Sequence, residues 1–379
     1  MATEYRINMN RFNGTDYDVM YPRTLTEQVI NGQRQIVISS VSLSTTWSGS
    51  GPYTQVVTVD GADAKSKVDL QPDSTIIESL SEDGVTAIYI VNDSGTLTAV
   101  ATGAAPTTAL NIQCSIEEVV EYTPPVSNVL DDNSWSTIKW VSNHNLGSNY
   151  WSVGATKKIT MNGKVSDGLT LTNFETYVYI LGFNHNEALE GSGITFGGFK
   201  TAQAGGTNIG LVDSNYGSYR ESGQWFNMNN GLINTGGWKD SLMRTVTMPL
   251  IKSALPSDFS SIIKSIYKYT DNVGGGNGSV ESNISTTQDD VFLLGEYEIF
   301  GTNTHANTYE ASKQMQYNYY VIGNSKIKYK HSNTANVASW WERSPKSTAS
   351  STFCRVDLQG HASADGAFNS FGVAPAFVV

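Results

Sequence analysis

The chain has 379 residues and a formal net charge of −11, an acidic balance that argues against a nucleic-acid partner, because phosphate binding needs clustered Lys and Arg. Charged residues make up only 16% of the chain, against about 25% in ordinary globular proteins, which argues against long surface helices and favours a β-rich, loop-rich fold. The sequence has no run of 18 apolar residues, so we expect no membrane-spanning helix and no membrane insertion.

The first part of the chain, residues 1–34, is polar with scattered aromatic side chains. It lacks the apolar stretch of a secretion signal. We therefore predict an attachment segment, in a protein that is synthesised in the cytoplasm and leaves the cell by lysis or within a particle.

Short segments with Val and Ile at alternate positions recur between residues 35 and 122, a pattern typical of half-buried strands. These segments are QIVISSVSLS, YTQVVTVD, VTAIYIV, TLTAVA and ALNIQCSIEEVVEY. One helix interrupts them, beginning after Pro72 and Asp73 and ending at Gly84. Its apolar face consists of Ile76, Ile77 and Leu80. The pattern predicts a small β-sandwich that carries one helix.

The next segment, residues 123–133, is predicted to be a linker, because Pro124 and Pro125 cannot join a strand ladder. Seven of the eight tryptophans follow it, which favours one large domain over residues 134–379. We expect a helix in LPSDFSSIIKSIYKYT, where Leu255, Phe259, Ile262 and Ile266 recur at helical spacing. Expected strands are STIKWVS, KKITM, ETYVYILGF, DDVFLLGEYEIFG and YNYYVIG.

Few residues indicate catalytic or metal chemistry. His185, Glu187 and Glu190 lie close together and could bind a metal ion, but a hydrogen-bonded loop is the favoured interpretation. Glu296 and Glu298 would share one face of a strand, which fits acid–base chemistry or calcium, although structural hydrogen bonding is commoner.

Asp289 and Asp290 could form another acid–base pair. GGGNGS (274–279) lacks the Lys-Ser/Thr ending of a phosphate loop and follows no apolar strand, so we expect a flexible loop. The two cysteines, Cys114 and Cys354, are expected to be buried free thiols, with a single bridge as the alternative. We predict no enzyme activity and no cofactor, a structural calcium ion remaining possible.

Several framework segments of the second region resemble one domain family when taken together. They are WSTIKWVS (135–142), YWSVGATKKITMNG (150–163), ILGFNHN (180–186), GGWKDSLMR (236–244), DDVFLLGEYEIFG (289–301), WWERSP (340–345) and FGVAPAFVV (371–379). The set is similar to a family common in prophages of gut bacteria, which has a C-type-lectin-like fold related to that of formylglycine-generating enzymes. The resemblance implies a mainly β fold with some α (α+β): an N-terminal β-sandwich followed by a C-type-lectin-like domain.

The last part of this domain resembles the variable region of target proteins of diversity-generating retroelements. In that family an anchor like WWERSP precedes a stretch whose Asn codons are mutated at adenines, and a strand like FGVAPAFVV closes the fold. Adenine mutagenesis of such codons cannot yield Lys, Gln, Glu, Met or Trp. Lys346 and Gln359 are then exceptions within a variable region of about residues 346–371, and both need another origin.

Alternation along this stretch separates a frame from a surface. The frame is Phe353, Cys354, Val356, Gly360 and Ala362, supported by Trp340, Trp341, a paired Arg343 and Phe377. Aromatic and Arg side chains among small ones suit a binding surface. The predicted ligand-binding residues are Ser347, Thr348, Ser350, Ser351, Thr352, Arg355, Asp357, Leu358, Gln359, His361, Ser363, Asp365, Phe368, Asn369 and Phe371.

The N-terminal segments FNGTDYDVMYPRT, WSGSGPYTQVVTVDG and KVDLQPD also look like a phage tail or fibre module. The resemblance as a whole implies a receptor-binding protein of the virion, the phage tail fibre, that adheres to a host surface protein or glycan. It implies attachment to other tail proteins through the N-terminus and a homotrimer, since repeated weak contacts add through avidity. The alternative is a lectin-like binder with a fixed carbohydrate or protein ligand. An oxidase function is disfavoured, because the formylglycine-generating branch uses paired cysteines or copper and this region has only Cys354.

Overall fold

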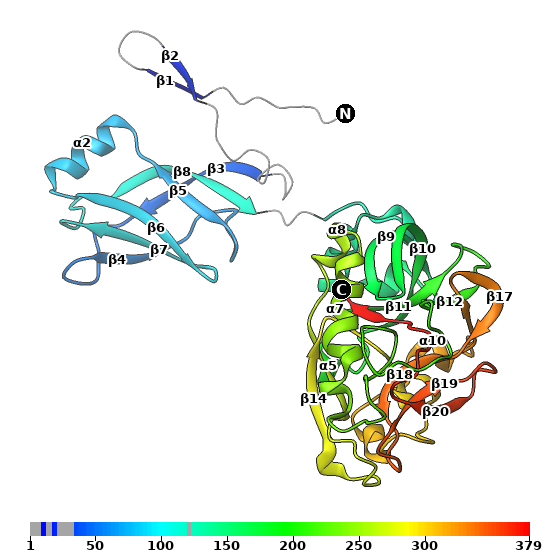
Figure 1. Cartoon of the computed structure of the whole chain (residues 1–379). Helices are drawn as coiled ribbons and strands as arrows, with labels where there is room; N and C mark the ends of the chain where they lie inside the picture. The colour runs from blue at the N-terminus through cyan, green and yellow to red at the C-terminus, as the bar shows by residue number, and fades with distance from the viewer. Residues whose placement is uncertain (1–8, 13–16, 21–33, 120–122) are drawn as a thin grey trace. The chain divides into compact units, whose positions relative to one another are not determined.

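The computed structural model describes residues 9–12, 17–20, 34–119 and 123–379 (Figure 1). The chain divides into two compact units, Met1–Thr123 and Pro124–Val379. Both are mainly β, and both also contain helical segments, which are more numerous in the second unit. Within the predicted attachment segment, strands β1 (Met9–Phe12) and β2 (Tyr17–Met20) pair antiparallel, and the rest of that segment up to residue 33 lies outside the described residues.

The N-terminal unit contains two three-stranded antiparallel sheets, ordered β3-β8-β5 and β4-β7-β6. The strands are β3 (Arg34–Leu43), β4 (Tyr53–Val57), β5 (Lys67–Gln71), β6 (Ala87–Asp93), β7 (Thr96–Thr102) and β8 (Leu110–Val119). Alternate side chains of both sheets join one buried apolar cluster, which includes Val41, Val57, Leu97, Ile112 and Cys114. The segments with period-two alternation are therefore confirmed as strands.

The predicted helix of this unit is α2 (Ser74–Glu82). It begins where the Asp73 carboxylate accepts the backbone N–H of Ile76 at 2.9 Å, which satisfies one of the free donors of the first turn. Leu80 is buried in the cluster, but Ile77 is 53% exposed, so the apolar face is narrower than predicted.

The C-terminal unit is built on an eight-stranded sheet with the order β15-β21-β11-β12-β16-β17, in which β10 pairs with both β11 and β9. Its strands are β9 (Thr156–Ser166), β10 (Leu169–Phe183), β11 (Ile194–Lys200), β12 (Asn208–Gly210), β15 (Val291–Phe292), β16 (Lys328–Lys330), β17 (Asn333–Ala338) and β21 (Ala376–Val378). A hairpin of β13 (Ile266–Asp271) and β14 (Ile284–Asp289) accompanies it. The third sheet is β18 (Trp340–Pro345), β19 (Thr352–Val356) and β20 (Ala362–Gly366).

The predicted strand STIKWVS is instead the helix α3 (Trp135–Asn143). The Ser134 hydroxyl accepts the N–H of Thr137 at 3.1 Å and so begins the helix. Trp135, Ile138 and Val141 recur every three residues and bury one face. This part of the prediction was wrong because the cap and the helical spacing outweighed the β-branched content.

Three further predictions around short helices were wrong. YNYYVIG contains the helix α10 (Asn318–Val321), and DDVFLLGEYEIFG leaves strand β15 after two residues to form α9 (Glu296–Phe300). The helix expected from Leu255 to Ile266 is only one turn, α8 (Ser257–Ser260), and Ile266 begins strand β13. The remaining short helical segments are η1 (Leu130–Asp132), α4 (Gly147–Tyr150), α5 (Glu187–Glu190), α6 (Gly237–Asp240), η2 (Met243–Thr247), α7 (Met248–Ala254), η3 (Glu281–Asn283) and η4 (Thr308–Ser312).

The segment assigned to a linker belongs largely to the C-terminal unit, which begins at Pro124. The side-chain amide of Asn133 donates to the carbonyls of Ser127 at 3.0 Å and Val129 at 2.8 Å. The Trp151 indole donates to the same Ser127 carbonyl at 3.0 Å. These bonds and the buried side chain of Leu130 tie residues 124–133 to the unit.

The core of the C-terminal unit is aromatic. Trp135 stacks on Phe259 with ring centroids 3.8 Å apart, and Phe377 packs edge-on against Phe259 at 5.0 Å. Trp340, Trp341, Arg343 and Phe377 are each 0% exposed, which confirms them as buried supports. Among the described residues, none of the helices has both the length and the apolar character needed to cross a membrane.

Candidate binding surface

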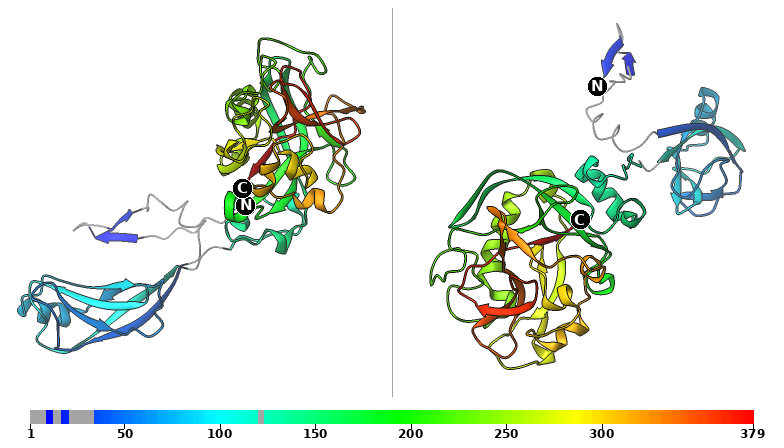
Figure 2. Two further views of the ribbon diagram at one scale, coloured as in Figure 1. Left: turned by 90° about the horizontal axis from the view of Figure 1, so that it is seen from below. Right: turned by 90° about the vertical axis from the view of Figure 1, so that its right-hand side faces the viewer.

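Strand β18 is a rigid base, since every residue from Trp340 to Pro345 is buried. The indole N–H of Trp340 donates to the carbonyl of Lys326 at 2.9 Å, and that of Trp341 donates to the carbonyl of Phe226 at 2.8 Å. Both bulky rings therefore have their polar atoms satisfied inside the fold. Figure 2 shows β18, β19 and β20, coloured orange to red, lying together in both views.

Arg343 carries its charge into the core and is paired there, as predicted. Its guanidinium donates to Glu298 at 2.8 Å, and Lys268 contacts Glu298 at 2.7 Å and Glu190 at 2.8 Å. Burial alone would raise the pKa of Glu298, but the charges of Arg343 and Lys268 outweigh it and lower that pKa below its usual range. The buried charges thus balance one another beneath the sheet.

Strand β19 separates frame from surface in part as predicted. Phe353, Cys354 and Val356 are buried, whereas Arg355 is only partly buried. The Arg355 guanidinium lies over the Phe371 ring at 4.9 Å, and that ring packs edge-on against the buried Trp341 at 5.1 Å. These three side chains form a layer that runs from the core to the surface.

Arg355 is also fixed by polar contacts. It donates to the Ser339 hydroxyl at 2.8 Å, and its Nε lies 3.2 Å from the Asp365 carboxylate on the neighbouring strand. Asp365 in turn accepts from the Asn369 amide at 2.7 Å. The predicted residues Arg355, Asp365 and Asn369 are thus brought together as one polar group.

The turn between β19 and β20 projects three exposed side chains of the predicted set. The Asp357 carboxylate accepts the backbone N–H groups of Gln359 at 2.9 Å and His361 at 2.8 Å, which fixes the turn. Gly360 has a φ of +85°, a conformation that a side chain would strain. Leu358, Gln359 and His361 are exposed around it. These side chains are free to contact a partner.

The loop before β19 is held from a distant part of the chain. The Asn234 side-chain amide donates to the carbonyls of Ala349 and Thr352, each at 2.7 Å, and its oxygen accepts the N–H of Gly275 at 2.8 Å. Gly276, in the GGGNGS segment, packs against the backbone of Ala349 and Ser350. The glycine loop therefore supports this surface.

The predicted surface residues differ in exposure. Ser347 is only 8% exposed, and its N–H and hydroxyl both donate to the carbonyl of His305, so its placement on the surface was wrong. Thr348 and Ser350 are exposed. Partly buried members are Ser351, Thr352, Arg355, Asp357, Ser363, Asp365, Phe368, Asn369 and Phe371.

An apolar patch, which no sequence pattern predicted, adjoins these residues. Tyr219 is 61% exposed and lies 5.0 Å from the Phe368 ring, and Leu232 is 56% exposed. A side chain at Gly366 would come within 2.9 Å of Leu232. We call Tyr219, Leu232 and Phe368 the apolar patch. The binding surface is this patch together with all the predicted ligand-binding residues except Ser347.

The predicted metal ligands occupy a cluster that already contains cations. Glu187 is exposed, Glu190 pairs with Lys268, and His185 stacks on Tyr317 with centroids 3.6 Å apart. Burial and the nearby Lys268 lower the pKa of His185 to about 3. Together these contacts support the interpretation of a hydrogen-bonded loop.

Glu296 and Glu298 do not share a strand face, because they lie on helix α9 and point to different partners. Glu298 binds Arg343, whereas the Glu296 carboxylate accepts the N–H groups of Thr304, His305 and Ala306 at 2.7–2.9 Å. The expected strand face was therefore wrong, whereas structural hydrogen bonding, the favoured interpretation of these two carboxylates, is confirmed.

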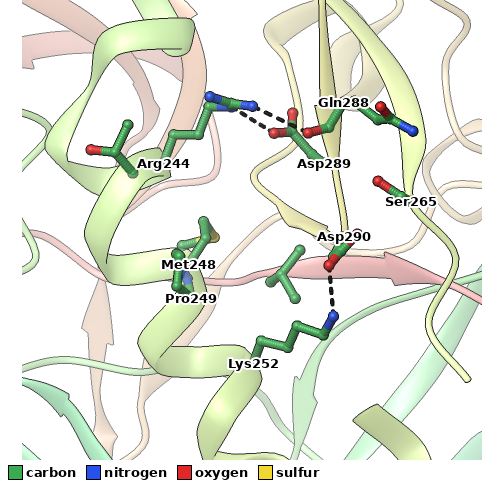
Figure 3. A pocket seen from close by; sticks show the side chains of 10 residues that line it. Arg244, Met248, Pro249, Lys252, Ser265, Gln288, Asp289 and Asp290 are labelled. Carbon is green, nitrogen blue, oxygen red and sulfur yellow. Dashed lines mark hydrogen bonds and ion pairs between the residues drawn. The ribbon is translucent and has the colours of Figure 1, made fainter. Parts of the chain in front are cut away.

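A pocket of about 490 Å³ lies away from the binding surface and includes none of its residues (Figure 3). Asp289 pairs with Arg244 and Asp290 with Lys252, each at 2.6 Å. Asp289 also accepts the indole N–H of Trp238 at 3.0 Å. The acidic pair therefore provides ion-pair partners that join η2 and α7 to the end of β14.

The C-terminal unit thus combines a mixed α and β framework with an exposed surface at the end of the chain. Residues 214–379 match the model of a family described as a domain of unknown function (DUF6273). The match includes the whole binding surface. No curated protein and no solved structure matches the chain.

Proposed function

We propose that the protein is a phage or prophage tail-fibre receptor-binding protein whose C-terminal unit adheres to the host cell through the binding surface. In this proposal the C-terminal unit has a C-type-lectin-like fold and the N-terminal unit a β-sandwich fold. The resemblance of the framework segments supports this proposal. The positions of the frame and surface residues that the resemblance implies support it as well. The N-terminus attaches to other tail proteins, and the place of action is the virion.

One observation carries the proposal: the same short stretch of chain contains wholly buried and openly exposed side chains. Trp340 to Pro345 are buried without interruption, while Leu358, Gln359 and His361 are exposed on a fixed turn. A surface that rests on a buried frame tolerates changes in the side chains that it exposes. Diversification by a retroelement requires that property, because every new sequence must still fold.

The adjoining apolar patch favours a macromolecular ligand. Aromatic side chains and Arg carry most of the contact energy in binding interfaces, and aromatic side chains beside small Ser residues are typical of antibody binding loops. Tyr219 and Leu232 lie outside the predicted variable region, so they would supply constant contact area beside varied positions. The ligand class is a host surface protein or glycan.

The genome distinguishes diversification from the alternative, a lectin-like protein with a fixed carbohydrate or protein ligand. Diversification predicts an imperfect downstream repeat of codons 340–379 that is rich in AAC or AAT, beside a reverse transcriptase gene. A complete genome without these elements would contradict diversification and favour the fixed ligand.

The proposed assembly is a homotrimer, in which three binding surfaces act through avidity. Sedimentation equilibrium of the full chain measures this directly. One chain has a mass of 41.1 kDa, and the proposal predicts three times that mass. A monomer at micromolar concentration would contradict it.

A further inference from the structure

Three chemically reactive side chains meet beneath the binding surface. Glu296 from α9, Glu342 from β18 and Cys354 from β19 place a carboxylate oxygen or the sulfur within 4.8 Å of one another. Each of the three residues is 0% exposed. Oxygen and sulfur donors from three different elements thus converge on one buried point.

Glu342 has no partner for its polar atoms. Neither carboxylate oxygen accepts or donates a hydrogen bond in the described part of the chain, although both are fully buried. Nor does any described Lys, Arg or His lie within ion-pair distance of Glu342, since the adjacent Arg343 turns to Glu298. A buried carboxyl group without a partner is costly, so a further group at this point would stabilise the arrangement.

The second cluster of acidic side chains, by contrast, has cationic partners. His185, Glu190 and Glu298 also lie within 4.8 Å of one another, but Lys268 contacts both carboxylates at 2.7–2.8 Å. A metal ion there would meet the ammonium and guanidinium charges. The cluster around Glu342 lacks such a cation among the described residues, so a metal ion would supply the missing positive charge.

We propose that Glu296, Glu342 and Cys354 bind one thiophilic divalent cation of the Zn²⁺ class. The sulfur ligand selects against Ca²⁺ and Mg²⁺, which prefer oxygen ligands, and thiolate with carboxylate suits Zn²⁺ or Co²⁺. Ligands about 2.0–2.3 Å from zinc lie roughly 3.3–3.5 Å apart in a tetrahedron, so each pair of ligand atoms, now within 4.8 Å, would close in by at most about 1.5 Å. The remaining position is available to a water molecule.

The contacts of Glu296 fit this role. Three backbone N–H groups already hold its carboxylate, and a carboxylate offers about four acceptor positions, so one remains for a metal ion. The ion would join α9, β18 and β19 and brace the frame from within. This inference concerns the frame alone and does not depend on the proposed host-binding function.

The test uses Co²⁺ as the probe, because a cobalt–thiolate bond gives a charge-transfer absorption that carboxylate binding does not. Since the site is buried, the full chain without an affinity tag is expressed with cobalt chloride or zinc chloride in the medium. The protein is dialysed against EDTA, and its metal content is measured. We expect about one Co²⁺ or Zn²⁺ per chain and the charge-transfer band in the cobalt form.

Three variants complete the test. Cys354→Ser should abolish the band, whereas Cys114→Ser, which changes the buried thiol of the N-terminal unit, should retain it. Glu342→Gln has the shape of the native side chain and should weaken retention against EDTA by about tenfold or more, which keeps the test decisive if Cys354→Ser fails to fold. Folded wild-type protein without bound metal, or a band that survives in Cys354→Ser, would overturn the proposal in favour of a proton-bearing, metal-free cluster.

Discussion

Arg343 and Lys268 place two positive charges in the core, and Glu298 contacts both. The three side chains are 0% exposed, so each charge has lost its hydration and depends on the others. Removing one partner of such a group leaves an uncompensated buried charge, which costs far more than the loss of a surface ion pair.

The variant Glu298→Gln should therefore lower the free energy of unfolding by about 3–5 kcal/mol, measured by denaturant titration of the C-terminal transition. The matched control is Glu175→Gln, which breaks the exposed pair with Lys158 and should cost about 1 kcal/mol or less. Equal losses in the two variants would show that the buried cluster carries no special weight.

His185 is a second residue whose charge state matters. It stacks on Tyr317, and its buried Nε2 has no hydrogen-bond partner in the described part of the chain. Burial and Lys268 lower its pKa from 6.5 to about 3, so between these values the unfolded chain binds a proton that the folded chain excludes. Its contribution to stability is present above pH 6.5 and is lost as the pH falls through that window.

The variant His185→Phe keeps the ring stacking and removes this titration. Relative to the variant, wild-type protein should lose about 2 kcal/mol of unfolding free energy between pH 7 and pH 5, measured by denaturant titration at each pH. The comparison is needed because burial raises the pKa of Glu310 to about 7, and that group acts in the opposite direction over the same range. Parallel pH profiles of the two proteins would contradict the assignment.

Among the elements, the turn between β19 and β20 should tolerate substitutions, whereas strand β18 should not. The triple variant Leu358→Ala, Gln359→Ala, His361→Ala should alter the unfolding free energy by no more than about 1 kcal/mol, because these side chains are exposed. Trp341→Ala should cost about 3–5 kcal/mol, because it removes a buried ring and the hydrogen bond from its indole N–H to the Phe226 carbonyl. Denaturant titration measures both, and a triple variant that loses as much as Trp341→Ala would contradict the division.

Sequence patterns predicted these elements unevenly. The strands of the N-terminal unit could be predicted because one face of each is buried, which produces period-two alternation. Segments such as STIKWVS and YNYYVIG are too short for helical and strand periodicity to be distinguished. The N-cap at Ser134 favours a helix in the first of them.

Sequence patterns predicted the binding surface only where residues close together in the sequence form it. Alternation and the resemblance placed Arg355 and His361 at the surface, but Ser347 was wrong because the His305 carbonyl holds it inside. Tyr219, Leu232 and Asn234 reach the surface from more than 100 residues away. No local pattern marks such contacts, since tertiary packing alone creates them.

At the scale of the whole molecule, the two units should respond separately to proteolysis. Because Asn133, Ser127 and Trp151 bind residues 124–133 to the C-terminal unit, limited digestion should leave a stable fragment that begins close to Pro124. Mass spectrometry of the fragment measures its start. A stable fragment that begins after residue 133, or digestion of the whole chain without any fragment, would contradict this organisation.

Adsorption to bacterial cells tests the claim that an unchanging frame presents the binding surface to a host. The labelled full chain is mixed with a panel of gut bacterial strains, alongside a variant in which Thr348, Ser350, Leu358, Gln359 and His361 are all Ala. We predict that the wild-type protein adsorbs to a subset of strains and that the variant, with an unchanged melting temperature, loses or redirects that adsorption. Undiminished adsorption of the folded variant to the same strains would contradict the claim.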